Sequence, residues 1–108
     1  MIISGGENVY SAEVENAIST MPGVAEVAVI GVPDERWGER VHAIVVPKQG
    51  SALTADALME HCRGQIAGYK CPRSVDIRDT PLPLSGAGKV LKRELREPYW
   101  QGFTRGVN

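Results

Sequence analysis

Residues 24–32 read VAEVAVIGV and residues 41–46 read VHAIVV. β-Branched residues dominate both stretches, and apolar side chains follow one another without strict alternation. Runs of this length that are apolar on both faces, each followed here by a proline, are typical of strands buried on two sides. The two stretches therefore predict the centre of a β-sheet, with a polar loop over residues 34–40 that holds Trp37.

Helical patterns flank these strands. Ser11 can cap one helix, which ends at Pro22-Gly23, and Thr54 can cap a second. Apolar residues recur at helical spacing in both, namely Val14, Ala17, Ile18 and Met21 in the first and Ala55, Leu58, Met59, Cys62 and Ile66 in the second. A short strand is predicted over residues 74–78. A short basic helix is predicted over residues 90–97, and Pro98 ends it.

The order of these elements predicts an α+β fold. The turn signal Gly5-Gly6-Glu7-Asn8 lies between two short apolar stretches and predicts an N-terminal hairpin. After it we expect a small, mostly antiparallel three-stranded sheet packed with two to three helices. Residues 1–97 form the expected domain and residues 98–108 a C-terminal tail. Half of the six aromatic residues lie in the last ten positions, which predicts that Tyr99, Trp100 and Phe103 dock on the domain or on a partner.

Composition narrows the function classes. A chain of 108 residues is one domain, and 12 basic against 13 acidic residues exclude a broadly basic nucleic-acid binder. No apolar run approaches the length of a membrane span. Two cysteines, Cys62 and Cys71, and two histidines are too few and wrongly spaced for a metal site, so we expect none. The thiols are typical of a reduced, cytoplasmic protein.

Lys89 is the strongest candidate for chemistry. It follows the flexible stretch Leu84–Gly88, and a lysine on such a loop is a reachable cation for a phosphate or carboxylate. The stretch is not a P-loop, because Pro83 stands where that motif needs its first glycine and Val90 where it needs Ser or Thr. On spacing alone, a solvated surface lysine is the alternative.

Other candidates also have two interpretations. Gly5 and Gly6 either let a thin ligand pass the backbone or only satisfy a turn. Trp37 lies in a polar loop and either packs on the core or stacks on a ligand. Tyr69 and Arg73, on one loop, offer an aromatic ring and a cation for a nucleotide, or form an ordinary solvated turn.

Four motifs together resemble a known family. They are residues 1–10 (MIISGGENVY), residues 29–34 (VIGVPD), residues 37–39 (WGE) and the stretch at residues 83–96 that contains SGAGKVLKRELR. In this order and spacing they resemble the C-terminal domain of AMP-forming acyl-CoA synthetases, members of the adenylate-forming superfamily. The resemblance runs from residue 1 to residue 97.

The resemblance implies a two-step ligase. A carboxylic acid and ATP give an acyl-adenylate and pyrophosphate, and the CoA thiol then displaces AMP. A large N-terminal nucleotide-binding domain, absent here, would hold ATP, Mg²⁺ and the acyl pocket. The small domain would rotate between the steps. Because the chain begins after the usual hinge, we expect an excised domain of a cytoplasmic fatty- or aryl-acid ligase. It should be inactive when isolated, because most ATP contacts would lie on the absent domain.

Site roles follow residue by residue from the resemblance. Lys89 matches the lysine of the adenylation step, and Gly5 and Gly6 match the loop that lines the pantetheine tunnel. Trp37 matches a position that stacks on the CoA adenine in some ligases. Tyr69 and Arg73 match positions near the CoA nucleotide and its phosphates, although a cysteine follows Lys70 where some relatives have a basic residue.

Two alternatives stay open at this stage. One is a stand-alone module that binds CoA or pantetheine without catalysis. The other is the equivalent domain of an adenylation enzyme that loads a carrier protein. Trp37 with Arg73 favours free CoA, because a carrier-bound pantetheine brings no adenine.

Overall fold

Two long antiparallel strands form the centre of the computed structural model, which describes residues 1–101. Strand β3 (Val24–Asp34) pairs with β4 (Gly38–Pro47) from Val24 opposite Pro47 to Asp34 opposite Gly38. Both predicted central strands are confirmed. They extend further than the apolar runs, so the expected polar loop shrinks to a tight turn between Asp34 and Gly38.

Three short strands complete a five-stranded sheet in the order β2-β1-β4-β3, with β5 also on β4. The predicted hairpin is present as β1 (Ile2–Ser4) and β2 (Glu7–Val9), and it joins β4 where Ser4 pairs with Gly38. Strand β5 (Ser74–Ile77) runs parallel to β4, and the other strand pairs of the described residues are antiparallel. The mostly antiparallel α+β fold is thus confirmed, with the hairpin part of the same sheet.

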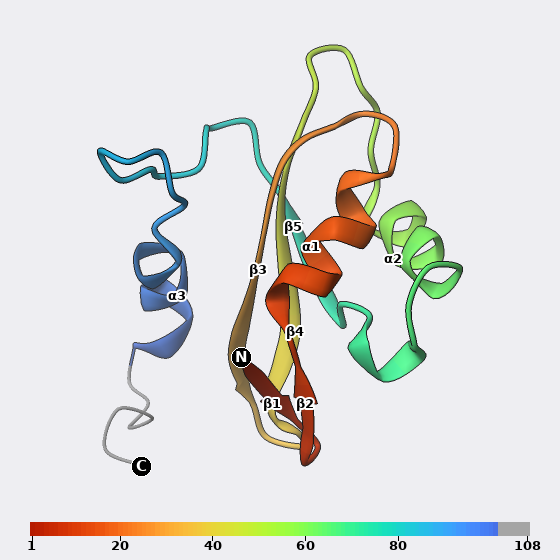
Figure 1. Cartoon of the computed structure of the whole chain (residues 1–108), viewed down its shortest axis with the longest axis vertical. Coiled ribbons are helices and arrows are strands. Elements are labelled where there is room, and N and C mark those ends of the chain that lie inside the picture. Colours follow the sequence, from red (N-terminus) through yellow and green to blue (C-terminus); the bar gives the residue numbers. More distant parts are fainter. Residues whose placement is uncertain (102–108) are drawn as a thin grey trace.

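Helices cover both faces of the sheet (Figure 1). Helices α1 (Ser11–Ser19) and α2 (Ala55–Arg63) lie on one side, and α3 (Lys92–Trp100) lies on the other. Alternate residues of β4 point to the two layers, so Ala43 packs on the side of α1 and α2, while Ile44 faces α3. This is why both central strands are apolar on both faces.

Each face has its own apolar cluster. The larger, under α1 and α2, contains Ile2, Val9, Val14, Ile18, Val24, Val29, Val41, Ala43, Val45, Leu58, Cys62 and Cys71. The smaller, under α3, contains Ala28, Ile30, Val32, Ile44, Val46, Leu82 and Leu95. Burial raises the pKa of Cys62 to about 11, so this thiol stays protonated and packs as an apolar group.

One of the two predicted helix caps is confirmed. Thr54 accepts a hydrogen bond from the Ala57 backbone N–H at 3.2 Å. The other prediction was wrong, because α1 has Tyr10 at its N-cap position without a side-chain cap, and Ser11 is already helical. The Ser11 hydroxyl instead accepts a hydrogen bond from Lys92 Nζ at 2.8 Å, which ties α1 to α3.

Helix α3 differs from its prediction at the C-terminal end. It continues through Pro98 to Trp100 instead of stopping at Pro98. Proline removes one backbone hydrogen bond of the helix, and tertiary hydrogen bonds offset this loss. Tyr99 donates its hydroxyl proton to Asp76, and the Trp100 indole N–H donates to Gly31 O at 2.9 Å. The expected docking is therefore observed for these two aromatics, and Phe103 lies outside the described residues.

The outer edge of β3 is occupied by side chains. Glu15 accepts the Val29 N–H at 2.9 Å and pairs with Lys92 at 2.7 Å. Trp100 binds Gly31 O further along the same edge. Within residues 1–101, no helix has both the length and the apolar character needed to cross a bilayer.

We predict that Leu58→Ala lowers the free energy of unfolding by about 2–5 kcal/mol, because the Leu58 side chain is fully buried in the larger cluster. Urea denaturation followed by circular dichroism measures this. Leu84→Ala is the matched control, since Leu84 is 54% exposed. It should change stability by less than about 0.5 kcal/mol. Equal losses would contradict the assignment of the core.

Candidate functional site

The turn between β3 and β4 presents Trp37. Asp34 Oδ1 accepts hydrogen bonds from the backbone N–H groups of Arg36 at 2.8 Å and Trp37 at 2.9 Å. An aspartate at a strand end commonly closes such a turn with its own side chain. The pKa of Asp34 lies below its usual value, chiefly because its carboxylate accepts the Trp37 N–H. The Arg36 N–H and the charge of Arg40 lower this pKa further, while burial raises it.

The hairpin turn between β1 and β2 packs against this indole. The Gly5 N–H donates to Trp37 O at 2.9 Å. Gly5 has a φ of +60°, and a Cβ placed there would lie only 2.6 Å from Trp37 Cε3. Gly6 has a φ of +84°, but a Cβ there would meet no atom within 4 Å. Both positions favour glycine, and of the two, Gly5 also needs it for space.

Two arginines lie over the Trp37 ring. The Arg73 guanidinium is 4.2 Å from the ring centroid, and that of Arg36 is 5.0 Å away. Trp37 is half-buried and belongs to neither apolar cluster. The ring therefore lies outside both apolar clusters, between the hairpin turn and the two arginines, and stacking on a ligand stays a prediction. Gly5, Trp37, Arg36 and Arg73 are together called the indole cluster below.

Tyr69 stands apart from the indole cluster. It lies on the single 3₁₀ turn Gly68–Lys70 with its side chain 42% exposed, and no ring contact joins it to Trp37 among residues 1–101. Its neighbour Lys70 binds both oxygens of Glu13, at 2.9 and 3.1 Å, and this hydrogen bonding raises the pKa of Lys70. The pair fixes the 3₁₀ turn to α1.

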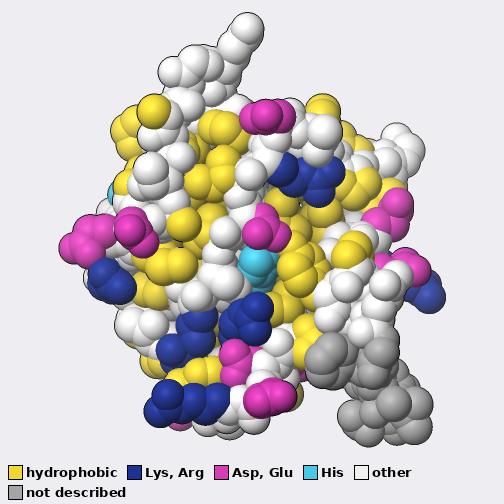
Figure 2. Space-filling view, turned by 180° about the vertical axis from the view of Figure 1, so that it is seen from behind, with side chains coloured by type: hydrophobic (Ala, Val, Ile, Leu, Met, Phe, Trp, Pro, Cys, Tyr) yellow, Lys and Arg dark blue, Asp and Glu magenta, His cyan; other side chains and the backbone are white. Residues whose placement is uncertain are grey.

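The end of the molecule that carries the indole cluster is rich in cations. Figure 2 shows Lys and Arg side chains gathered toward the lower end of the rear face, interspersed with carboxylates. A hollow of about 350 Å³ lies beside Arg73 and is also lined by Arg63, Cys71 and Met59. An aromatic ring with guanidinium groups around it can hold a flat base and an anionic group.

Lys89 lies at the base of a tight loop. Leu84 pairs with Val90, and Ser85 N donates to Lys89 O at 2.8 Å, so the loop closes as a small hairpin. Lys89 is exposed, and within residues 1–101 no hydrogen bond or ion pair engages its ammonium group. A cation held this way is available to an anion that arrives from outside the domain.

The structure does not bring Lys89 together with the indole cluster. The loop over residues 84–90 lies above α3 in Figure 1, toward the upper end of the molecule, while the β1–β2 and β3–β4 turns that carry Gly5 and Trp37 lie at the lower end of the sheet. The sequence-predicted residues thus lie in separate places. Lys89 is on its own loop, Gly5, Trp37 and Arg73 are in contact, with Gly6 on the same turn as Gly5, and Tyr69 stands apart on the 3₁₀ turn Gly68–Lys70.

A Ser-His-Asp arrangement also occurs but has a structural role. Ser74 Oγ lies 2.6 Å from His42 Nδ1, and Asp76 Oδ2 lies 3.1 Å from His42 Nε2. His42 is only 3% exposed, and burial lowers its pKa despite the opposing charge of Asp76. Its ring also meets the Tyr99 ring at 4.8 Å between centroids. The cluster fastens β5 and α3 to β4.

Sequence reasoning missed three residues of the indole cluster and its surroundings. Asp34, Arg36 and Arg40 looked like solvated members of a mixed-charge loop. Asp34 carried a usable signal, because an aspartate just after a strand-ending proline favours a side-chain-closed turn. Arg36 adjoins Trp37 in the same turn, but nothing in the sequence shows that its side chain lies over the ring. Arg40 carried no signal, since its contacts depend on the pairing of β4 with β3 and β5.

Comparisons with known proteins give a consistent answer. Residues 13–89 match the family model of the AMP-binding enzyme C-terminal domain. A feruloyl-CoA synthase of Amycolatopsis sp is 54% identical over 99 residues, which are 92% of this chain and 20% of that protein. The fatty acid–[acyl-carrier-protein] ligase ScoC of Streptomyces coeruleorubidus is 45% identical over 107 residues, 99% of this chain and 20% of ScoC.

A solved structure agrees with these sequence matches. A Mycobacterium tuberculosis fatty acyl CoA synthetase superposes with a TM-score of 0.86 at 48% identity, covering 96% of this chain and 20% of the other. The chain therefore spans about a fifth of the length of the curated relatives that it matches.

The two hairpin glycines generate a paired prediction. Gly6→Ala should cost about 1–2 kcal/mol of stability, the strain of a left-handed L-residue. Gly5→Ala should cost about 1–3 kcal/mol more, because its Cβ must displace the Trp37 ring. Urea denaturation gives both values, and near-ultraviolet circular dichroism should change only for Gly5→Ala. Identical behaviour of the two variants would rule out the Gly5–Trp37 contact.

Proposed function

The chain belongs to the family of AMP-binding enzyme C-terminal domains, as its motifs predicted, and from this membership we propose that it is the small mobile domain of an AMP-forming acyl-CoA ligase. It supplies the adenylation lysine and part of the CoA tunnel for ATP-dependent thioester formation from a carboxylic acid. The observation that carries the proposal is the presence, on one domain, of an exposed lysine and an indole cluster at separate ends.

In the first step, a carboxylate oxygen attacks the α-phosphorus of ATP and pyrophosphate leaves. Both reactants are anions, so their approach is opposed by charge. The Lys89 ammonium bridges the carboxylate and the α-phosphate and stabilises the charge that both share in the transition state. Its exposed place on a closed loop, with no partner among the described residues, supports this role.

In the second step, the CoA sulfur attacks the acyl carbonyl carbon and AMP leaves with the bonding electrons. We assign the passage of the pantetheine chain to Gly5 and Gly6, since the open space over Gly6 supports a thin ligand there. Trp37 stacks on the adenine, and Arg73 and Tyr69 contact the nucleotide and its phosphates. In the free domain Arg73 covers the indole, so the base either displaces this guanidinium or extends its stack.

The domain acts only with a partner. We propose that an N-terminal nucleotide-binding domain of the same protein holds ATP, the carboxylic acid and Mg²⁺, because the chain matches a C-terminal domain of AMP-binding enzymes and spans about a fifth of its relatives. From the motifs we place the domain at residues 1–97 and a tail at residues 98–108, although α3 crosses this boundary and ends at Trp100. We propose a fatty or aryl acid as the substrate, in keeping with relatives named as feruloyl-CoA and fatty-acid ligases. A cytoplasmic location completes the proposal, in keeping with two free thiols.

A carrier-protein-loading ligase is the second candidate. It is favoured by the 45% identity to ScoC, which is named as a fatty acid–[acyl-carrier-protein] ligase. The acceptor separates the two candidates, because only CoA carries a nucleotide for Trp37 and Arg73. Product formation with CoA and with a phosphopantetheinylated carrier protein, measured side by side in the full-length ligase, decides between them.

We predict that Lys89→Ala in the full-length ligase slows acyl-adenylate formation by about 100-fold or more, the effect of removing one preorganised charge partner. Transfer of the acyl group from preformed adenylate to CoA should change little. Lys48→Ala, at another exposed lysine, is the control and should leave both steps intact. Equal losses in both steps for Lys89→Ala would refute the assigned role.

Trp37→Ala should raise the KM for CoA by roughly 5- to 150-fold, as expected for the loss of a stacking energy of about 1–3 kcal/mol. The KM for ATP should stay the same. In the chain alone, CoA should bind at millimolar affinity at best, because stacking barely offsets the cost of association. Chemical shifts of the Trp37 indole and of Gly5 and Gly6 report this binding. Unperturbed shifts and an unchanged KM would remove Trp37 from the site.

A further inference from the structure

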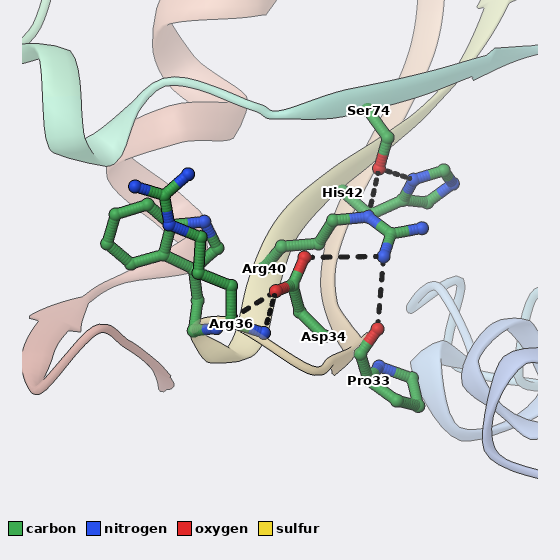
Figure 3. A network of polar contacts seen from close by, with 7 residues as sticks. Pro33, Asp34, Arg36, Arg40, His42 and Ser74 are labelled. Atoms are coloured by element: carbon green, nitrogen blue, oxygen red, sulfur yellow. Dashed lines mark hydrogen bonds and ion pairs between the residues drawn. The ribbon is translucent and has the colours of Figure 1, made fainter.

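Arg40 connects two of the three chain segments that carry the indole cluster, the turn with Trp37 and the segment with Arg73. It lies near the start of β4, with β3 on one side and β5 on the other. Figure 3 shows its guanidinium group between Asp34 and Ser74, with Pro33 beside it. These contacts join segments that are distant in sequence, because Arg40 and Ser74 are 34 residues apart.

The first contact of Arg40 is with the turn that presents Trp37. Arg40 Nη1 donates to Pro33 O at 3.0 Å and lies 3.5 Å from Asp34 Oδ2. Asp34 uses its other oxygen, Oδ1, to accept the N–H groups of Arg36 and Trp37. One carboxylate therefore shapes the turn with one oxygen and is anchored to β4 by the other.

The second contact fixes the segment that carries Arg73. Arg40 Nε donates to Ser74 Oγ at 3.0 Å, and Ser74 is the residue that follows Arg73. Arg73 N donates to Val41 O at 2.8 Å, so the backbone at this point is already held next to β4. His42, 2.6 Å from Ser74 Oγ, limits the rotation of that hydroxyl from the other side.

A planar guanidinium is suited to both contacts at once. Its Nε–H and Nη–H groups diverge at fixed angles, so a single side chain sets the separation between Asp34 and Ser74. Asp34 is 17% exposed and Arg40 34%, so the contacts are partly shielded from solvent. The Trp37 ring and the Arg73 guanidinium, carried by the two segments that Arg40 joins, lie 4.2 Å apart.

We propose that Arg40 is a positioning residue for the nucleotide half of CoA. It holds the Trp37 turn and the Arg73 segment at the spacing that lets the indole stack on the base while Arg73 reaches a phosphate. This inference rests on the proposed function. It adds that selectivity for CoA over acceptors without a nucleotide depends on a side chain that contacts neither the base nor the phosphates.

The test compares CoA with pantetheine, which has the same thiol arm but no nucleotide, as acceptors for the full-length ligase. Arg40→Gln should raise the KM for CoA by about 10-fold, since small misplacements of positioned groups have effects of this size or larger. The KM for pantetheine and the rate of acyl-adenylate formation should be unchanged. A merely destabilised enzyme would lose activity with both acceptors alike, and that result would overturn the proposal.

Partial variants test each contact. Asp34→Asn keeps an oxygen for the turn but removes the ion pair, and Ser74→Ala removes the other contact. Each should raise the KM for CoA less than Arg40→Gln does.

Arg40→Lys keeps the charge but not the two divergent donors, so it should show the same raised KM for CoA as Arg40→Gln. An unchanged KM for CoA in Arg40→Lys would overturn the proposal. Arg78→Gln, at an arginine whose side chain bonds Thr80 and Pro81, is the matched control.

Direct variants separate this proposal from the function on which it rests. Trp37→Ala and Arg73→Ala should both raise the KM for CoA and spare that for pantetheine. If they do so and Arg40→Gln does not, the positioning role is refuted while the CoA site stands. If neither direct variant changes the KM for CoA, the assignment of the CoA nucleotide to the indole cluster fails.

Discussion

Burial of the β3–β4 pair on both faces is the constraint on which the rest of the molecule depends. A two-sided apolar ribbon needs a layer on each side, and α1 with α2 supplies only one. After β5 the chain must therefore cross the sheet to place α3 on the second face. The crossing segment, residues 78–91, contains Lys89. The loop that exposes Lys89 thus belongs to the connection that places α3 on the second face of the sheet.

The same two strands also determine the indole cluster. Their tight turn holds Trp37, and the pairing of β4 with both β1 and β5 brings Gly5 and Arg73 to the same end. The polar contacts of Asp34 and Arg40 then refine an arrangement that backbone pairing has already made. Apolar burial and strand register therefore fix where the Lys89 loop and the indole cluster lie. Polar contacts of Asp34 and Arg40 adjust the spacing between the segments of the indole cluster.

The sequence predicted the features that depend on local pattern. The central strands, the Thr54 cap and the hairpin around Gly5 and Gly6 all have short-range signals of periodicity or turn chemistry. The sequence could not predict that Ser11 binds Lys92 or that α3 continues past its proline, because both depend on contacts between distant segments. For the site, Trp37 and Arg73 were apparent as residue types, but their contact at 4.2 Å and the contacts of Arg40 with Asp34 and Ser74 join distant segments and appeared only in the structure.

The occupied edge of β3 has a consequence for how the domain behaves in solution. Open strand edges recruit further strands from neighbouring molecules and start aggregation. Here the Glu15 carboxylate covers the Val29 amide and the Trp100 indole covers the Gly31 carbonyl, while Pro33 has no N–H to offer. The last turn of α3 therefore blocks part of the β3 edge from pairing with a strand of another molecule. A chain cut before Trp100 would keep its core but expose a template for intermolecular β-pairing.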